Sequence, residues 1–336
     1  MILYAGRDQL KAWRINELGD PWEKLMIEEI ESPSPKAGQI SISVEATDLN
    51  FADILQCQGR YQVKLTPPFS PGMNAAGTIL EVGEDVELLQ VGQRVVGPTM
   101  GGYGGYAAQA VLLAGQCQVL PDTVSSMAAS AIHVTYGTAW FALHQRGNLQ
   151  PGETVLVLAG AGGVGSAAIQ LAKAHGCWVT AAAGGVDKIA LCKRLGADEV
   201  IDYNTEELYD RSMRLTSDRG YDVIYDPVGG DFFDVVRRLV AWEGRLLVIG
   251  FASNRIPQAP ANHILMKNYS VVGVHMGAYR KQDPAPFERC YNELYEMLDK
   301  GQIEPWIDSV VDFDELPAAL LSLANRETKG RLVFEP

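Results

Sequence analysis

The stretch between residues 154 and 176 constrains this chain most, because it joins three local signals in a fixed order. It opens with an apolar, β-branched run from Thr154 to Ala159, which is typical of a buried parallel strand. Glycines follow at positions 160, 162 and 165, in the spacing G-x-G-x-x-G, and small apolar residues then recur at helical spacing. The order strand, glycine turn and helix predicts the first half of a dinucleotide-binding unit.

Each residue of this turn has a physical task in such a unit. We expect Gly160 to permit the tight turn, Gly162 to let a pyrophosphate approach the backbone, and Gly165 to let the helix pack on the strand. Gly163 and Val164 would begin the helix, whose unpaired N–H groups and positive dipole end favour phosphate. The alternative is the strand-to-helix turn of an ordinary α/β domain, which the flanking strand and helix disfavour.

Length and charge limit the other possibilities. A chain of 336 residues favours two domains, and 47% hydrophobic with 21% charged residues is typical of a soluble globular protein. A formal net charge of −13 argues against nucleic-acid partners and an anionic membrane surface. No apolar run reaches membrane-spanning length, and the first 13 residues lack the apolar core of a signal peptide. These features predict a cytoplasmic protein.

The five cysteines are widely spaced and form no C-x-x-C pair. This spacing indicates neither a disulfide framework nor a structural zinc site.

The pattern of the chain changes near residue 125. Short strands separated by Gly/Pro turns come before it, including the turn at 101–106, and indicate a β-rich domain. After it, an Ala-rich helical segment at 126–143 leads into alternating strands and helices, which predict a parallel sheet covered on both faces. The expected strands of this sheet lie at 154–159, 178–182, 199–201, 223–226, 246–249 and 270–274. The expected helices between and after them lie at 187–195, 206–215, 232–239, 284–300 and 315–324.

Motifs along nearly the whole chain resemble those of the medium-chain dehydrogenases/reductases, and within them the zinc-free quinone oxidoreductases. They are Asn50–Asp53, Gly59–Tyr61, Pro71–Gly77, Val91–Val95, Ala159–Gly165, Leu195–Asp198 and Lys329–Arg331. The resemblance implies an α/β fold in which a doubly wound Rossmann domain is inserted into a β-rich, GroES-like catalytic domain. We therefore expect a catalytic domain at 1–125 and 276–336 and an NADPH-binding domain at 126–275. It also implies a homodimer joined along strand 270–274.

The resemblance bears on metal binding as well. Zinc alcohol dehydrogenases of this superfamily use Cys and His or Glu ligands, usually with an added four-cysteine loop. The similar positions here hold Asn50, Met73 and Asn74, and residues 92–116 contain no cysteine. Amide and thioether groups make a poor zinc site, so we expect no metal.

The tip of the second Rossmann strand indicates which nicotinamide cofactor binds. It reads Ala181-Ala182-Ala183-Gly184-Gly185 and lacks the acid that usually holds the ribose hydroxyls of NAD. Lys188 is suited to pair with a 2′-phosphate, and Tyr203 matches a family position beside that phosphate. Gly184, at the acid-free tip, belongs to the predicted cofactor site. The alternatives are that Asp187 serves as the ribose acid or begins a helix, and that Lys188 is solvated surface. The features favour NADPH.

Two polar residues match the substrate site of the family. Asn50 and Tyr61 carry an amide N–H and a phenol O–H that can donate to a carbonyl oxygen as negative charge develops. The alternatives are a turn residue for Asn50 and partial core burial for Tyr61. Thr138 matches a position near the nicotinamide, or instead bonds its own helix backbone.

The ends of later strands complete the predicted cofactor site. Val228 follows the fourth Rossmann strand, and Gly250-Phe251-Ala252 follow the fifth, at the edge where such sheets bind cofactors. Lys329 either approaches the cofactor or is solvated. His275 is a possible proton donor, although a structural role is favoured for it.

His133 and His144 have no partner pattern and are predicted to be structural.

Together these features predict an NADPH-dependent, zinc-free reductase that transfers hydride to a small quinone or activated enone. One alternative is an enoyl-thioester or alkenal double-bond reductase. Another is a non-catalytic NADPH-binding protein of the same fold.

Overall fold

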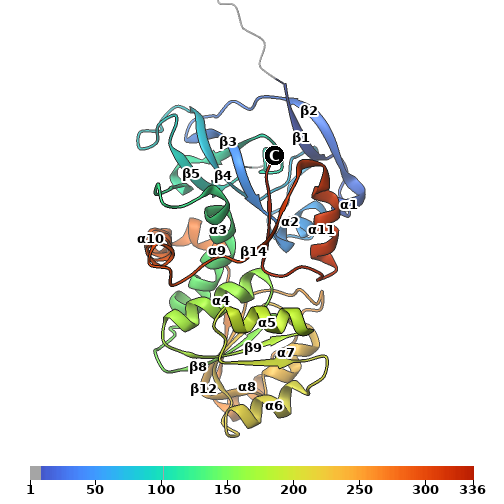
Figure 1. Ribbon diagram of the computed structural model, residues 1–336, viewed down its shortest axis with the longest axis vertical. Helices are drawn as coiled ribbons and strands as arrows, with labels where there is room; N and C mark the ends of the chain where they lie inside the picture. Colours follow the sequence, from blue (N-terminus) through green and yellow to red (C-terminus); the bar gives the residue numbers. More distant parts are fainter. Residues whose placement is uncertain (1–8, 101) are drawn as a thin grey trace, which may run out of the picture. The chain divides into compact units, whose positions relative to one another are not determined.

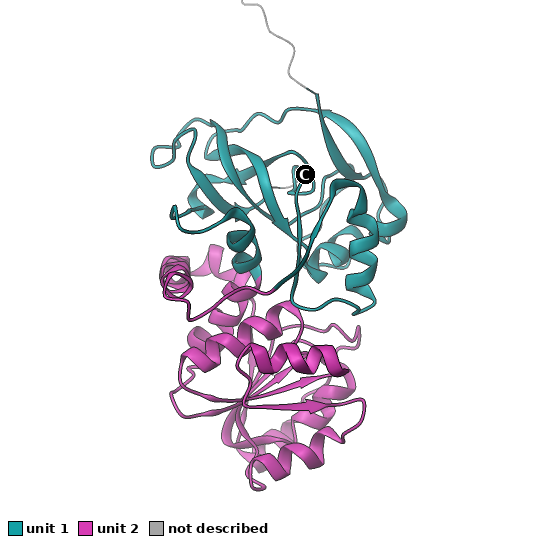
Figure 2. Ribbon diagram, in the orientation of Figure 1, with its two compact units in different colours: residues 1–134, 307–336 teal, residues 135–306 magenta. Residues whose placement is uncertain are grey.

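The computed structural model describes residues 9–100 and 102–336, and the chain divides into two compact units (Figure 2). The two ends of the chain form the first unit, up to residue 134 and from residue 307 on, and residues 135–306 form the second. The opening eight residues and Gly101, the first residue of the expected turn at 101–106, lie outside the described residues.

The boundaries differ from the expected ones, because residues 276–306 belong to the second unit. The main element of this segment is α10 (Ala285–Asp299), which buries its apolar face there. Its Phe287 ring packs on Phe141 with centroids 4.8 Å apart, and its Glu293 accepts a 2.6 Å hydrogen bond from the Trp140 indole. The hydrophobic periodicity predicted the helix but not the partner that covers it.

The second unit is built on a six-stranded sheet in the order β10-β9-β8-β11-β12-β13, with every neighbouring pair parallel. Its strands are β8 (Thr154–Leu158), β9 (Trp178–Ala183), β10 (Glu199–Asp202), β11 (Tyr221–Asp226), β12 (Val240–Val248) and β13 (Ser270–Gly273). The order reverses between β8 and β11, and this is the point where doubly wound sheets bind their ligands.

Helices cover both faces of this sheet, as Figure 1 shows with α4 and α5 on one side and α6 and α8 on the other. They are α4 (Gly163–Ala174), α5 (Val186–Arg194), α6 (Leu208–Leu215), α7 (Gly230–Val236) and α8 (Ala261–Lys267). Leu156, Ile224 and Leu246 are fully buried beneath them. Burial of each such side chain contributes roughly 1.5–3 kcal/mol, which fixes the strands that carry the glycine turn.

The first unit contains the hairpin β1 (Gln9–Ile15) and β2 (Leu25–Glu31) and a seven-stranded sheet. The sheet has the order β14-β15-β3-β4-β5-β7, with β6 pairing β3. Its strands are β3 (Gln39–Asp48), β4 (Asn74–Val82), β5 (Arg94–Pro98), β6 (Gln109–Leu113), β7 (Gln118–Val119), β14 (Ile307–Val311) and β15 (Arg331–Phe334). Because Val333 of β15 pairs with Asp48 of β3, the two ends of the chain meet in one sheet.

The remaining helices show where local patterns were insufficient. They are α1 (Pro21–Lys24), α2 (Phe51–Cys57), α3 (Ser126–Trp140), α9 (Met276–Gln282) and α11 (Leu316–Ala324), with 3₁₀ turns at Ala114–Gln116 and Phe313–Glu315. α8 and α9 were not predicted, since both are seven residues long and bury no residue. α3 continues directly into a π-helix at Phe141–Arg146, three residues beyond the expected helix end.

Within the described part of the chain, no helix combines the length and the apolar character needed to cross a bilayer.

Candidate functional site

The glycine turn lies between β8 and α4 and is packed too tightly for larger residues. A Cβ atom on Gly165 would lie 2.2 Å from the Ala159 carbonyl oxygen, and one on Gly160 would lie 2.9 Å from the Ala181 Cβ. At Gly162 the nearest atom is 3.2 Å away, so this glycine faces more open space. Ala159 itself has a φ of 50°, which a side chain rarely adopts and which turns the backbone toward the helix.

Helix α4 begins at Gly163, with Gly162 as its N-cap and no side chain bonded to its first turn. The first N–H groups of a helix lack partners within the helix, and here Gly163, Val164 and Gly165 supply them. Together with the positive end of the helix dipole, they form a phosphate-binding cradle next to the order reversal of the sheet. The turn therefore has the geometry that a dinucleotide pyrophosphate requires.

The tip of β9 brings together two of the expected cofactor residues. A Cβ on Gly184 would lie 2.6 Å from the Tyr203 ring, so the ring lies directly against this glycine. Tyr203 is 38% exposed and packs edge-on against Phe232, with centroids 5.3 Å apart. Lys188 lies on the first half of α5 and is half-buried.

A carboxylate that the sequence analysis did not consider lies at this tip. Asp202 ends β10, and its Oδ1 accepts hydrogen bonds from the backbone N–H groups of Gly185, at 3.3 Å, and Asn204, at 3.1 Å. It shapes the loop after β9 through these bonds. The signal was present in the sequence, because Asp202 ends the strand that neighbours β9 in a parallel sheet.

The ends of β11 and β12 are tied to each other. Buried Asp226 accepts 2.8 Å hydrogen bonds at Oδ1 from the N–H groups of Val228 and Gly229, and burial raises the pKa of this carboxyl. The Ala252 N–H donates to the Pro227 carbonyl at 3.1 Å. Val228 and the segment Gly250–Ala252 therefore form one loop pair at the strand ends where the sequence analysis expected them.

Two other predicted residues of the second unit lie at the start of α9. The Thr138 hydroxyl lies 3.9 Å from the Met276 sulfur, and His275 is the exposed N-cap residue of α9. Lys329 belongs to the first unit, where its N–H donates to Asp308 at 3.3 Å.

The first unit holds a cluster of buried charged and polar side chains around Asn50. Arg331, which is 4% exposed, donates from Nη2 to the Asp48 carboxylate, to the Leu49 carbonyl at 2.6 Å and to the Asn50 Oδ1 at 2.9 Å. The Asn50 Nδ2 donates to the Asp48 Oδ1 at 2.9 Å. Burial raises the pKa of Asp48, and the guanidinium of Arg331 opposes this shift.

This cluster changes the interpretation of Asn50. Its side chain is 5% exposed, its oxygen accepts from Arg331, and its amide N–H groups face Asp48. In this arrangement the amide also organises the start of α2. Tyr61 is half-buried, and burial together with the charge of Asp53 raises the pKa of its phenol, so the phenol stays protonated and able to donate.

Asp53 is the second carboxyl of the cluster and is fully buried. It accepts hydrogen bonds from the backbone N–H groups of Asn50, at 2.8 Å, and Met73, at 2.9 Å, and from the Tyr106 hydroxyl, at 3.0 Å. Burial outweighs these bonds and raises the pKa of Asp53 to about 7. The sequence offered only its place in the motif Asn50–Asp53 as a signal.

The raised pKa of Asp53 predicts a particular pH dependence of stability. Between about pH 4 and 7 the Asp53 carboxyl is protonated in the folded state and ionised in the unfolded state. The free energy of unfolding therefore falls as the pH rises and levels off above pH 7. We expect the free energy of unfolding of the wild type, minus that of Asp53→Asn, to fall by roughly 1.4 kcal/mol per pH unit in this range. Urea denaturation of both proteins at pH 5, 6, 7 and 8 measures this difference in free energy. A difference that stays constant or rises with pH would contradict the raised pKa of Asp53.

Comparison with known proteins gives the family. Residues 36–122 match the family model described as alcohol dehydrogenase GroES-like domain, and residues 163–297 match that of zinc-binding dehydrogenase. A quinone oxidoreductase-like protein 2 homolog from Nematostella vectensis is 37% identical over 98% of this chain and 90% of its own length.

Solved structures agree in fold. A mycobacterial protein in complex with NADPH is 28% identical with a TM-score of 0.89, and Escherichia coli quinone oxidoreductase in complex with NADPH is 25% identical with the same score. Both matches cover 97% of this chain and 100% of the other. The fold and the glycine turn thus define an oxidoreductase of the medium-chain dehydrogenase/reductase superfamily. Within that superfamily, the chain belongs to the quinone oxidoreductase-like proteins.

The zinc in the name of one family model can be tested against the residues present. The Asn50 oxygen already accepts from the Arg331 guanidinium, a buried cation that would repel a metal ion. The Asn74 amide donates to the Ser130 carbonyl at 3.1 Å. Across residues 9–100 and 102–336, no three His, Cys, Asp or Glu side chains are grouped so as to hold a metal. The donor set at Asn50, Met73 and Asn74 does not fit zinc.

Proposed function

We propose that this protein is an NADPH-dependent, zinc-independent reductase that transfers hydride to a small quinone or activated enone. The observation that carries the proposal is the glycine cradle at the start of α4 combined with a β9 strand whose own last residues carry no acid. The Asp202 carboxylate, which ends the neighbouring β10, is engaged by the backbone N–H groups of Gly185 and Asn204. Relatives along the full chain support it, because two structural neighbours of the same fold were solved with NADPH.

Residues of the second unit would hold the cofactor, whose reduced nicotinamide supplies the hydride when bound. The N–H groups at Gly163–Gly165 would bind the pyrophosphate, and Lys188 with Tyr203 would bind the 2′-phosphate beside Gly184. The loop pair of Val228 and Gly250–Ala252, with Thr138, would position the nicotinamide half. For Lys329 we propose only that it approaches the cofactor.

Residues of the first unit would orient the acceptor. Tyr61 would donate its phenol hydrogen to the acceptor oxygen as negative charge develops there. Asn50, held by Arg331 and Asp48, would fix the start of α2 and thereby the segment that leads to Tyr61. Exclusion of water around the two reactants would supply the rest of the rate enhancement.

Lys188 offers a residue-level test of cofactor choice. We expect Lys188→Ala to weaken NADPH binding about tenfold and to leave NADH binding unchanged, since it removes one charge-assisted contact to the phosphate. Lys193→Ala, an exposed lysine in the last turn of the same helix, is the matched control. Fluorescence titration of both cofactors measures this. Equal loss for NADPH and NADH, or NADH binding that is already tighter in the wild type, would refute the phosphate assignment.

The acceptor is tested by NADPH oxidation over a panel of quinones, alkenals and enoyl thioesters. Preference for quinones or simple enones supports the proposal, whereas preference for thioesters would favour the enoyl-thioester reductase alternative. Binding of NADPH without oxidation by any acceptor would favour a non-catalytic protein.

We also propose a cytoplasmic homodimer. β13 pairs with β12 alone among the described strands and so leaves one sheet edge open. Nearby α8 exposes Leu265 and Met266, each 78% exposed. A second copy adding its own β13 would cover this edge. Light scattering that gives the mass of one chain at micromolar concentration would contradict the proposed homodimer.

A further inference from the structure

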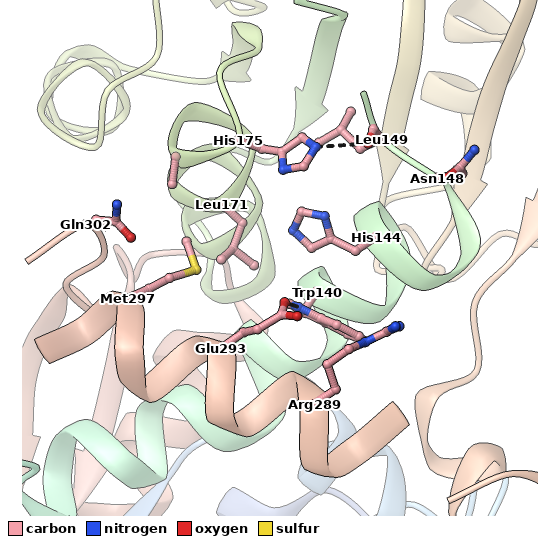
Figure 3. A pocket seen from close by; sticks show the side chains of 11 residues that line it. Trp140, His144, Asn148, Leu149, Leu171, His175, Arg289, Glu293, Met297 and Gln302 are labelled. Carbon is pink, nitrogen blue, oxygen red and sulfur yellow. Dashed lines mark hydrogen bonds between the residues drawn. The ribbon is translucent and has the colours of Figure 1, made fainter. Parts of the chain in front are cut away.

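A pocket in the second unit remains unused by the proposed reaction. It is lined by side chains from the π-helix and its flanks, from α4 and from α10, and it encloses about 450 Å³ (Figure 3). We call it the His144 pocket and define it by Trp140, His144, Leu171, His175, Arg289 and Met297. Its volume is in the range of sites that bind small organic molecules.

The pocket lies at the opposite end of α4 from the glycine cradle. His175, the C-cap of α4, lines the pocket, whereas Gly162 is the N-cap of the same helix. Twelve helical residues separate these ends, a length of about 18 Å at 1.5 Å per residue. The His144 pocket is therefore separate from the predicted phosphate site.

His144 is a polar side chain of this pocket with no hydrogen-bond partner among the described residues. Among the described residues, neither of its ring nitrogens has a hydrogen-bond partner, and the ring contacts only other rings, with centroids 4.9 Å from His175 and 5.8 Å from Trp140. By contrast, the His175 Nε2 lies 3.0 Å from the Leu149 carbonyl, and the Trp140 indole donates to Glu293. The ring nitrogens of His144 are not among the fully buried atoms without a partner, so they are open to a molecule that enters the pocket. A π-helix often marks a functional position.

Charges around His144 favour an anion as its partner. From α10, Arg289 and Glu293 face the pocket, and from α4, His175 does. Glu293 already accepts the 2.6 Å bond from Trp140. Burial, followed by the positive charges of His175 and Arg289, lowers the pKa of His144 to about 4. After burial, the cationic neighbours of this imidazole are the second reason that its pKa is low.

Part of the lining is apolar, beside the polar side chains of Asn148 and Gln302. Leu171 is fully buried and Trp140 is 1% exposed, so Met297, which is half-buried, presents the more open apolar surface. Methionine adapts to flat apolar ligands. A ligand that satisfies both parts of the pocket carries one negative charge and a flat apolar body.

We propose that the His144 pocket binds a small organic carboxylate with a flat apolar body, its charge facing His144 and Arg289. Binding favours protonation of His144, because the carboxylate offsets the positive charge that, after burial, disfavours the charged imidazole. This site does not depend on the proposed hydride transfer.

Benzoate is the probe, added to the full chain saturated with NADPH and followed by imidazole NMR of the five histidines. We expect saturable shifts of the His144 resonances and an affinity at least tenfold higher than for benzamide, its neutral analogue. His144→Asn and Arg289→Gln should each weaken benzoate binding at least tenfold. His263→Asn, which changes a histidine of α8 bonded to Tyr269, should leave it unchanged.

The proton uptake is tested with benzenesulfonate, which stays anionic throughout the range used. Its affinity should rise several-fold from pH 7.5 to pH 5.5 in the wild type and stay flat in His144→Asn. Equal binding of benzoate and benzamide, or binding that both His144→Asn and Arg289→Gln retain, would overturn the proposal. Absence of any saturable His144 shift at millimolar benzoate would do so as well.

Discussion

Replacing Gly165 with alanine is expected to weaken NADPH binding by at least about 100-fold. The new Cβ would lie 2.2 Å from the Ala159 carbonyl oxygen, a backbone atom that cannot swing away, so the start of α4 must shift. Loss of two phosphate hydrogen bonds to charged oxygens costs about 3–6 kcal/mol, which exceeds a factor of 100. Equilibrium titration of NADPH into the variant measures the effect.

Two other glycines make the result interpretable. Gly115→Ala places its Cβ where no atom lies within 4 Å, so it controls for the general effect of this substitution and should bind NADPH like the wild type. Gly162→Ala meets its nearest atom at 3.2 Å and should show an intermediate loss. If Gly165→Ala bound NADPH within threefold of the wild type, the cradle would not be the phosphate site.

Replacing Arg331 with methionine is expected to lower the free energy of unfolding of the first unit by about 3–5 kcal/mol. The change leaves the Asp48 carboxylate, which is 0% exposed, without its charge partner. It also removes the donor to the Asn50 oxygen. Urea denaturation followed by circular dichroism measures the loss.

The double variant Asp48→Asn with Arg331→Met separates the buried charge from the lost packing. It should recover at least half of the stability, because no uncompensated buried charge remains. Arg219→Met, which breaks the ion pair of a half-exposed arginine with Asp222, should cost about 1 kcal/mol or less. A cost for Arg331→Met as small as that of Arg219→Met would show that the cluster does not hold the first unit together.

The fold was predictable where the signal was local and strong. The alternation of apolar runs and helical periods after residue 125 predicted a parallel sheet, because buried strands of this kind tolerate few polar residues. α8 and α9 escaped prediction because each is seven residues long and has no fully buried residue. Residues 276–306 were assigned to the wrong side of the division, since no local pattern states that α10 packs on Trp140 and Phe141.

The residues of the candidate site were likewise predictable only where their contacts are local in the sequence or the fold pattern. Glycine spacing predicted a cradle because Gly160 and Gly165 are required by contacts within a few residues or on the neighbouring strand. The role of Asn50 was harder, since its partner Arg331 lies 281 positions away in sequence. His144 was predicted to be structural because it has no partner pattern in the sequence, and the pocket that it lines is formed by residues from distant parts of the chain.

Steady-state oxidation of NADPH at 340 nm, with a small quinone as acceptor and with protein dialysed against a chelator, measures the proposed activity and its independence of zinc. We expect quinone-dependent oxidation, with one NADPH consumed per quinone reduced, at a rate that the chelator leaves unchanged. Binding of NADPH without oxidation above the blank, or activity that returns only when zinc is added, would refute the proposed function.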